Sequence, residues 1–411
     1  MRVILQFLGE LKRERTRMFL TVLGIAWGTA SIVLMLSVGQ GVIEGARRGM
    51  QGMGKATVVV WGGETSKPYR GLKPGRKVRL REEDARLLRE KVKGIGSISP
   101  EYIRWGVYVS SGKRSMNTRT VGVWPEYGPL RNICPQEGGF LNQLDLRFKR
   151  RVVFLGDEVA RRLFGSDDPV GKVVHIDGVP FTVIGVMKKK LQTSSYSGMD
   201  KDATFIPAST FRVMFGHRYV NDIVYRPDDI SQAELVKAEV YRVMAWKYRF
   251  DPEDRQTLRM WDTIEGERAF GRVALGVQMF LGIIGGLSLL VAGVGLANIM
   301  YAVVRGRTRE IGIRMAVGAR PRDIIYEYLL HSALTVLAGG AIGFVLSWGL
   351  VEFINALPLK GEVFKYLGRP VMSTTTAIVA SVVLGVVALT AGIFPAKRAA
   401  SIDPAEALRY E

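Results

Sequence analysis

The stretch RGRTREIGIRMAVGARPRD, from Arg305 to Asp323, decides how the chain folds, because a long apolar segment lies on either side of it. Its six arginines outnumber its two acids, and a dense positive cluster between two membrane spans favours the cytoplasmic side. Ile311, Met315 and Gly318 are spaced to share one face of a helix, so the stretch predicts a small amphipathic helix that presents this face to a partner. The alternative is a plain positively charged loop.

Four segments of the chain carry no Asp, Glu, Lys or Arg: Met18–Ile43, Val273–Val304, Tyr328–Val351 and Val371–Ala396. Crossing a hydrocarbon core of about 30 Å takes roughly 20 helical residues, and each segment reaches that length. We therefore predict four transmembrane helices. The first segment is also too long for the apolar part of a cleaved signal peptide, so we interpret it as an anchor. Residues 44–271 mix charged residues with turn signals, which predicts a separate folded domain.

The second of these segments is longer than a membrane requires. Val273–Val304 would form about 48 Å of helix, against the roughly 30 Å to be crossed. The helix therefore either tilts strongly or projects from the bilayer as a stiff stalk. Such a stalk would join the folded domain to residues 305–325, the connector between the second and third apolar segments. The sequence leaves both interpretations open.

The distribution of Lys and Arg sets the orientation. The N-terminal flank, the connector and the C-terminal flank are rich in basic residues, whereas the loop between the third and fourth helices has only Lys360, Lys365 and Arg369. The positive-inside rule then places both termini in the cytoplasm and the folded domain outside it. The predicted divisions are a cytoplasmic amphipathic helix 1–17 (or a continuation of the first span), helix 18–43, extracytoplasmic domain 44–271, helix 272–304 with its stalk, cytoplasmic connector 305–325, helix 326–354, extracytoplasmic loop 355–370, helix 371–396 and cytoplasmic tail 397–411.

Residues 44–271 alternate short strand and helix patterns, which predicts an α+β fold with a mixed sheet. Asp177-Gly178, between two β-rich runs, predicts a tight hairpin. Ser231 and Glu234 stand at the start of a helical pattern in the arrangement of a capping box. The predicted strands are Thr57–Trp61, Tyr102–Ser110, Thr118–Val123, Arg151–Leu155, Val173–Ile176 and Phe181–Val186, and the predicted helices are Glu83–Val92, Glu158–Phe164 and Ser231–Tyr248.

Glycine pairs at G-x-x-x-G spacing occur in three of the predicted transmembrane helices. Small residues at this spacing let two helix backbones approach closely. Each pair alone is weak support, because glycine is common in membrane helices, but together they favour a tightly packed bundle, and a dimer is one way to build it. The pairs are Gly24 and Gly28, Gly282 and Gly286, and Gly339 and Gly343.

Catalytic and nucleotide sites are disfavoured by the residues. Gly49–Ala56, GMQGMGKA, has the glycine and lysine spacing of a phosphate loop, but Ala56 stands where Ser or Thr should bind Mg²⁺. Such a loop also needs a strand before it, and here a membrane helix precedes it. No His, Cys, Asp and Glu residues have the spacing of a metal site or of an activated nucleophile, so we expect no enzyme activity, metal or cofactor.

The net charge of +20 suggests that the chain binds a negatively charged partner. Nucleic acid is disfavoured, because the chain has no zinc-ligand spacing, no RNA-binding motif and no single basic helix. Anionic lipid headgroups are the better counter-charge for the arginines that flank the spans. Membrane lipid is therefore an expected partner and nucleic acid is not.

Three separated motifs resemble the MacB/FtsX-type permeases of ABC transporters. They are REIGIRMAVGARPRDI at Arg309–Ile324, LGDEVARRLFGSDDPVGKVVHIDGVPFTVIGV at Leu155–Val186, and FPAKRAASIDPAEALRYE at Phe394–Glu411. The resemblance covers essentially the whole chain, and the motifs occur in the family's order.

The resemblance implies four transmembrane helices, with a large extracytoplasmic domain of a porter-like and a smaller inserted α/β subdomain between the first two. Members act as homodimers, or as heterodimers with a related permease, on cytosolic ABC ATPase subunits. MacB itself carries its ATPase before the first span, whereas about 17 residues precede that span here, so the resemblance implies an ATPase on a separate chain. It also places the coupling helix in the connector. The candidate ATPase contacts are Glu310, Ile311, Gly312, Arg314, Ala316, Gly318 and Ala319.

The implied function is that of an inner-membrane permease subunit that passes the ATPase's movements to its extracytoplasmic domain. Such mechanotransmission drives efflux or extraction of a drug, a peptide or a lipoprotein. The alternative is an FtsX-like regulator of a cell-wall hydrolase that transports nothing. The substrate, its direction, the dimer type and the participation of a periplasmic adaptor protein are left open.

Overall fold

The computed structural model describes residues 15–357, 368–403 and 407, and the chain divides into two compact units. The helical unit consists of Met1–Ala46 and Gly271–Glu411, and the other unit is the domain Arg47–Phe270. The predicted N-terminal helix 1–17 lies almost entirely outside the described residues, as do most of the loop 355–370 and the end of the tail.

Four helices among the described residues are long and apolar enough to cross a membrane, which confirms the four predicted spans. They are α2 (Arg15–Gln51), α9 (Thr263–Gly306), α11 (Pro321–Ala356) and α13 (Thr374–Ala400). The helices extend beyond most ends of the charge-free segments, because backbone hydrogen bonding continues into the charged flanks. The exception is 371–373, which precede α13.

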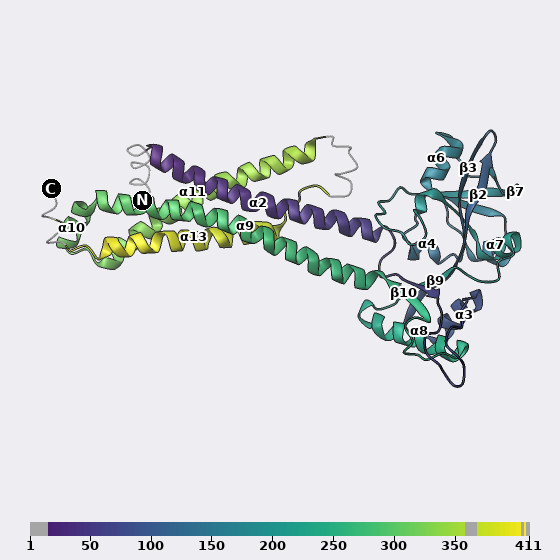
Figure 1. Ribbon diagram of the computed structural model, residues 1–411. Helices are drawn as coiled ribbons and strands as arrows, with labels where there is room; N and C mark the ends of the chain where they lie inside the picture. The colour runs from purple at the N-terminus through teal and green to yellow at the C-terminus, as the bar shows by residue number, and fades with distance from the viewer. Residues whose placement is uncertain (1–14, 358–367, 404–406, 408–411) are drawn as a thin grey trace. The chain divides into compact units, whose positions relative to one another are not determined.

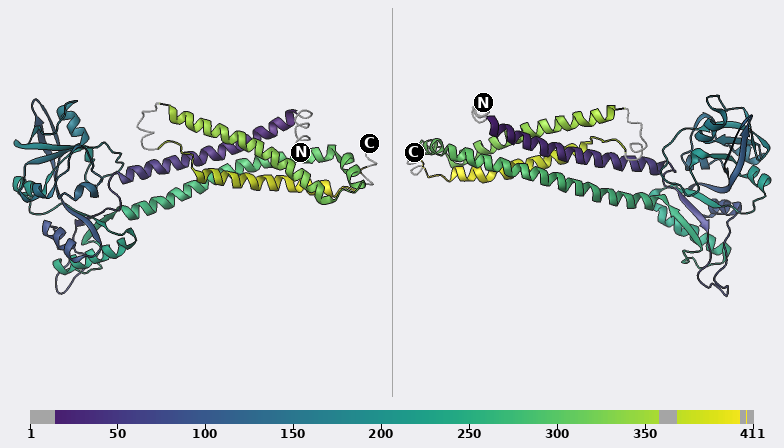
Figure 2. Two further views of the ribbon diagram at one scale, coloured as in Figure 1. Left: turned by 180° about the vertical axis from the view of Figure 1, so that it is seen from behind. Right: turned by 45° about the horizontal axis from the view of Figure 1, so that its top comes forward.

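The helices α11 and α13 pack against each other within the helical unit, and Figure 1 and Figure 2 show them close together toward the start of α11 and farther apart toward its end. Ser332 Oγ on α11 donates to the Ala388 carbonyl oxygen on α13 at 3.0 Å. A Cβ on Gly392 would lie 2.8 Å from Ser332 Cβ, so the glycine permits the close approach. At its start, α11 has Pro321 in its first turn, and Asp323 Oδ2 accepts from the Arg320 amide at 3.1 Å.

The domain is built on one mixed ten-stranded sheet in the order β10-β1-β9-β2-β3-β8-β5-β7-β4, with β6 pairing β2 and β7. The pairs β3 with β8 and β5 with β7 are parallel, and the other pairs are antiparallel, so the predicted α+β fold with a mixed sheet is confirmed. The strands are β1 (Val58–Gly62), β2 (Ile95–Ser111), β3 (Arg114–Val123), β4 (Pro135–Gly138), β5 (Val152–Leu155), β6 (Val173–Ile176), β7 (Val179–Met187), β8 (Ala203–Pro207), β9 (Asp222–Pro227) and β10 (Leu258–Asp262). The helical elements are α3 (Glu82–Lys91), α4 (Tyr127–Leu130), α5 (Gln143–Arg147), α6 (Asp157–Phe164), η1 (Asp200–Asp202), α7 (Ala208–Phe215), η2 (Ile230–Gln232) and α8 (Ala233–Tyr248).

The sheet is buried on both faces, because side chains alternate between two apolar clusters along its strands. In β1, Val58 and Val60 belong to one cluster and Val59 to the other. The first cluster also takes in Leu88 of α3 and Val240 of α8, which cover that face. The second cluster includes residues of α4 and the segment after it.

One of the two predicted turn and cap signals is confirmed and the other is wrong. Asp177 and Gly178 have φ of 46° and 80° and join β6 to β7, which is the geometry of a tight hairpin. The capping box at Ser231 and Glu234 does not form. Instead, Asp229 Oδ1 accepts from the Ser231 amide at 2.8 Å and begins the turn η2, so α8 starts two residues later than predicted.

The charge-free second segment lies inside one uninterrupted helix. α9 contains 44 residues and is therefore about 66 Å long. Its first residue follows directly on β10, and there Thr57 N donates to Thr263 Oγ1 at 2.8 Å while Thr263 Oγ1 donates back to the Thr57 carbonyl at 2.9 Å. This reciprocal pair fixes the start of α9 to the residue before β1. Whether the helix tilts or projects as a stalk stays a prediction.

The segment that mimics a phosphate loop lies between a helix and a strand. α2 ends at Gln51, and β1 begins at Val58. This is the reverse of the strand-then-helix order that the phosphate-binding motif requires, and it agrees with the order expected from the sequence.

Candidate functional site

The connector folds as a short helix, α10, from Thr308 to Ala316. Thr308 Oγ1 donates to the carbonyl oxygens of Val304 at 3.2 Å and Arg305 at 2.9 Å, which joins the new helix to the last turn of α9. Ile311 is 3% exposed and belongs to the same apolar cluster as Val304 and as Ile324 of α11. The apolar face of α10 therefore packs inward, against the long helices on either side of it in sequence.

Arg314 fixes α10 to α11 from the polar side. Its Nη1 donates to both carboxylate oxygens of Glu327 at 3.0 Å, and its Nη2 donates to Glu310 Oε1 at 2.6 Å. Because one guanidinium bridges carboxylates of two helices, the direction of α10 relative to α11 is set by charge-assisted hydrogen bonds as well as by packing.

The turn after α10 is closed by backbone hydrogen bonds. The Gly318 amide donates to the Met315 carbonyl and the Ala319 amide to the Arg314 carbonyl, both at 3.0 Å. Gly318 has a φ of 106°, which residues other than glycine rarely adopt. The prediction that Gly318 shares a helical face with Ile311 and Met315 is thus wrong, because the helix ends before it.

The candidate ATPase contacts divide by burial into three groups. Glu310, Ala316 and Gly318 are exposed, Arg314 and Ala319 are half-buried, and Ile311 and Gly312 are buried within the helical unit. The structure exposes two apolar residues that the sequence analysis missed, Val317 at 85% and Ile313 at 45%. Val317 and Ile313 are exposed because Ile311 packs inward. The spacing of the apolar residues alone does not show which face of α10 is buried.

The exposed residues of the connector include positive charges as well as apolar side chains. Arg305, Arg309, Arg320 and Arg322, in and beside α10, are all exposed.

The glycine pairs occupy different environments. Gly339 and Gly343 of α11 lie against α2, where an added Cβ would be 2.8 Å from Ile25 Cβ and 2.4 Å from the Ala26 carbonyl oxygen. Gly28 faces Leu289 of α9, and a Cβ added to Gly28 would lie 3.2 Å from the Leu289 Cα. A Cβ on Gly24, Gly282 or Gly286 would meet nothing within 4 Å among the described residues, whereas one on Gly285 would be 2.9 Å from the Ile32 Cα.

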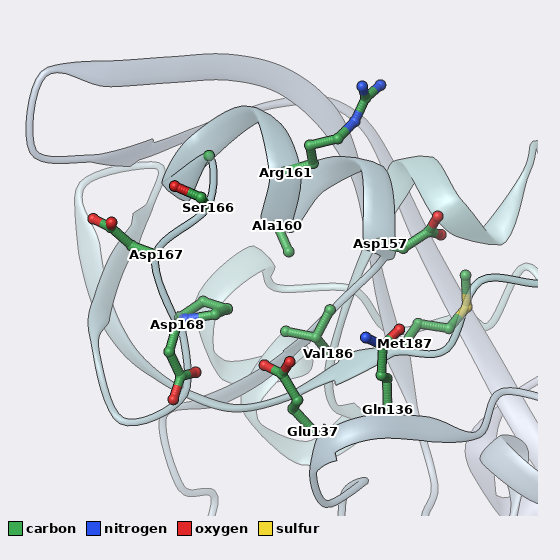
Figure 3. A pocket seen from close by; sticks show the side chains of 12 residues that line it. Gln136, Glu137, Asp157, Ala160, Arg161, Ser166, Asp167, Asp168, Val186 and Met187 are labelled. Carbon is green, nitrogen blue, oxygen red and sulfur yellow. The ribbon is translucent and has the colours of Figure 1, made fainter.

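A polar cavity of about 340 Å³ opens between α6, β4 and the turn after α6 (Figure 3). Asp157, Asp167, Asp168 and Glu137 line it, and Arg161 points away from it, with its guanidinium on Glu158 at 2.6 Å. Burial raises the pKa of Asp157 above its ordinary value. Within residues 15–357, 368–403 and 407, no three His, Cys, Asp or Glu side chains are grouped as a metal site.

A buried ion cluster lies next to the end of α4. Asp200 and Arg131 are both fully buried and lie 3.1 Å apart, and Lys190 Nζ is 2.8 Å from Asp200 Oδ2. Arg119, 4% exposed, adds a third cation at 3.6 Å. Burial alone would raise the pKa of Asp200, but Arg131, Lys190 and Arg119 lower it to about 2.

Two descriptions of known families match the chain. The MacB-like periplasmic core domain matches residues 18–243, and the FtsX-like permease C-terminal region matches residues 282–404. The second match contains the whole of α10.

Curated relatives match nearly all of this chain. The macrolide export ATP-binding/permease protein MacB of Chromobacterium violaceum is 31% identical over 97% of this chain and 59% of its own length. The protein of the same description from Bdellovibrio bacteriovorus is 28% identical over 98% of this chain and 60% of its own length. The chain thus spans about three-fifths of the length of these relatives.

Solved structures resemble part of the chain. The periplasmic region of MacB from Actinobacillus actinomycetemcomitans aligns with a TM-score of 0.43 at 18% identity, over 54% of this chain and 95% of that one. The extracellular domain of the transporter YknZ from Gram-positive bacteria aligns with a TM-score of 0.42 at 18% identity, over 50% of this chain and 99% of that one.

Proposed function

Because the chain belongs to the MacB/FtsX-type family of ABC transporter permeases, we propose that it couples ATP hydrolysis by a separate cytosolic ATPase to movements of its extracytoplasmic domain. In this proposal the chain is a multi-pass protein of the cytoplasmic membrane with both termini inside. The movements drive export or extraction of a drug, a peptide or a lipoprotein, and the curated relatives named for macrolide export support the drug class.

The observation that carries the proposal is the continuity of α9. One helix runs from the residue after β10 to the connector, with Thr263 hydrogen-bonded to Thr57 at its first turn and Thr308 hydrogen-bonded to Val304 after its last. In the proposal, a displacement applied at α10 passes along this single helix toward its first turn. The exposed apolar and basic surface of α10 supplies a place for the ATPase to apply that displacement.

The proposed complex contains two permease chains, identical or related, and two ATPase subunits, and a periplasmic adaptor protein is a further candidate partner. The names of the relatives join an ATP-binding and a permease part in one protein, which supports the ATPase partner alone. Their additional length leaves room for that ATP-binding part. In the proposal, the corresponding activity comes to this chain from a partner.

The proposal is tested by measuring ATP hydrolysis in lipid vesicles with the purified chain alone, the ATPase alone, and the two together. We expect hydrolysis only where the ATPase is present, and stimulation by the permease. Glu310→Lys places a second cation beside Arg314, and Gly312→Trp forces a large side chain into a buried position of α10. Both variants should abolish stimulation while the chain still inserts into the membrane.

The matched control is Glu90→Lys, which makes the same charge change at an exposed position of α3 in the domain. Unchanged stimulation by Glu310→Lys and Gly312→Trp would move the coupling surface away from α10. Hydrolysis by the chain alone would disprove the separate ATPase. Export of a substrate in cells that carry or lack the gene separates a transporter from the FtsX-like regulator, which would instead change cell-wall cleavage.

A further inference from the structure

Two carboxyl side chains lie next to each other in the interior of the domain. Glu101 of β2 and Asp222 of β9 are directly paired across the two antiparallel strands. Glu101 is fully buried, and Asp222 is 1% exposed. Two negative charges on directly paired, buried carboxyls repel each other strongly, which favours a state in which the pair holds one proton.

The hydrogen bonds around the pair favour Asp222 as the residue that carries the proton. Tyr127 Oη donates to Glu101 Oε1 at 2.9 Å, and Tyr196 Oη donates to Glu101 Oε2 at 2.5 Å. Both oxygens of Asp222, in contrast, find no donor in the part of the chain that the structure describes. When Asp222 is protonated, its O–H can donate to Glu101, which already accepts from the two tyrosines, and all of these groups are then satisfied.

The charges around the pair agree with this assignment. The Arg131 guanidinium lies over the rings of Tyr127 and Tyr196, 5.9 Å and 4.7 Å from their centres, so a positive charge lies near the pair. Arg119 of β3 also lies near, but both arginines are already engaged with Asp200. Burial and the neighbouring Glu101 raise the pKa of Asp222 well above the ordinary range of a carboxyl.

The pair is connected to the segment 188–199, which runs from the end of β7 to η1. Tyr196 belongs to this segment and is bound to Glu101. The same segment contacts the last turn of α2, where the Thr193 amide donates to the Gly49 carbonyl at 3.4 Å. Close packing continues at Gly52, where a Cβ would lie 1.9 Å from the Leu191 carbonyl oxygen.

We propose that protonated Asp222 donates a hydrogen bond to Glu101 and that its proton keeps the segment 188–199 attached to the sheet, so that losing the proton releases the segment from Glu101. When Asp222 ionises, its charge repels Glu101, and the carboxylate that holds Tyr196 is displaced. The hold of the segment on the end of α2 then weakens. The attachment of the segment 188–199, which connects the sheet of the domain to the end of α2, is thus sensitive to pH.

The direction of the pH effect follows from proton binding. The folded pair binds its proton more tightly than an unfolded chain does, so the attachment is complete at low pH and is lost as pH rises through the raised pKa of Asp222. Linkage to one proton makes the opening equilibrium change about tenfold per pH unit once the pair ionises.

The test measures hydrogen exchange in the full-length protein in detergent as a function of pH. The wild type is compared with Asp222→Asn, whose amide donates to Glu101 and cannot ionise, and with Asp228→Asn, the same change at an exposed position just after β9. We expect exchange at Thr193, whose amide is bound to Gly49, to rise with pH relative to the Asp222→Asn variant, by about tenfold per unit. Amides of β3 and β8 should show no such difference, and Asp228→Asn should behave as wild type.

Infrared spectroscopy of the wild type gives a second readout that needs no variant to fold. A buried protonated carboxyl should give its carbonyl band at neutral pH, and the band should vanish in Asp222→Asn. Absence of the band in the wild type, its persistence in the variant, or an identical pH response of the segment in both proteins would each overturn the proposal. So would a rise in exchange shared equally by β3 and β8, because the proton would then stabilise the whole domain rather than the segment.

Discussion

Arg314 of α10 holds Glu327 of α11 through two hydrogen bonds of 3.0 Å while it also binds Glu310 of its own helix. The three residues come from the connector and from the helix that follows it, so the connector is attached to the helical unit at a defined angle. In the proposed function, a force applied to α10 would therefore reach α11 as well as α9.

Arg314→Ala should loosen this attachment. We expect a loss of about 1 kcal/mol of stability, because the pair is partly exposed, together with a severalfold loss of ATPase stimulation in vesicles. Arg309→Ala removes an exposed arginine from the same helix and serves as the control. If both variants stimulate the ATPase equally well, the bridge has no part in coupling.

Val317→Asp should weaken binding of the ATPase without harming the fold. Val317 is 85% exposed, so the change in unfolding free energy should stay within about 0.5 kcal/mol. Copurification of the ATPase with the permease measures binding. Val213→Asp, at a 69% exposed position of α7, should leave copurification unchanged. Normal recovery of the ATPase with Val317→Asp would remove this residue from the interface.

Gly343→Ala should separate α11 from α2. The added methyl would lie 2.4 Å from the Ala26 carbonyl oxygen, so the helices must move apart, at a cost of about 1–3 kcal/mol. Gly349→Ala in the same helix meets nothing within 4 Å and should be neutral or slightly stabilising. Thermal unfolding in detergent compares the two variants. Equal midpoints would show that this close approach contributes little.

Asp200→Asn should destabilise the domain by about 3–5 kcal/mol, because Arg131 is left buried without its anion. The lowered pKa of about 2 means that Asp200 stabilises the domain above the carboxyl's usual pKa, and that this contribution is lost as pH falls toward 2. The variant should therefore lose part of the acid sensitivity seen in unfolding of the wild type. Asp167→Asn, at a largely exposed side chain, should retain it.

The sequence predicts the long helices and the local turns well, because both depend on neighbouring residues. A run without charges is sufficient for a span, and Asp177-Gly178 is sufficient for a hairpin, whatever the rest of the chain does. The start of α8 was missed for an equally local reason: Asp229 binds the Ser231 amide before a capping box can form.

Contacts between distant residues could not be predicted in this way. Arg131 and Asp200 are 69 residues apart, and no pattern in either neighbourhood marks them as partners. The same holds for the helix glycines. Spacing singles out Gly282 and Gly286, but the rotation of α9 brings Gly285 against Ile32 instead, and that rotation depends on the neighbouring helix.

The sequence has one cysteine, Cys134, and it is exposed on the domain that follows the first span. Because it is the only cysteine in the sequence, a thiol reagent would report on which side of the membrane this domain lies. A maleimide that cannot cross membranes should tag the unaltered protein on spheroplasts with an intact inner membrane, and Cys134→Ser should abolish the tag. Tagging only after the membrane is opened would place the domain inside the cell and reverse the orientation of every segment.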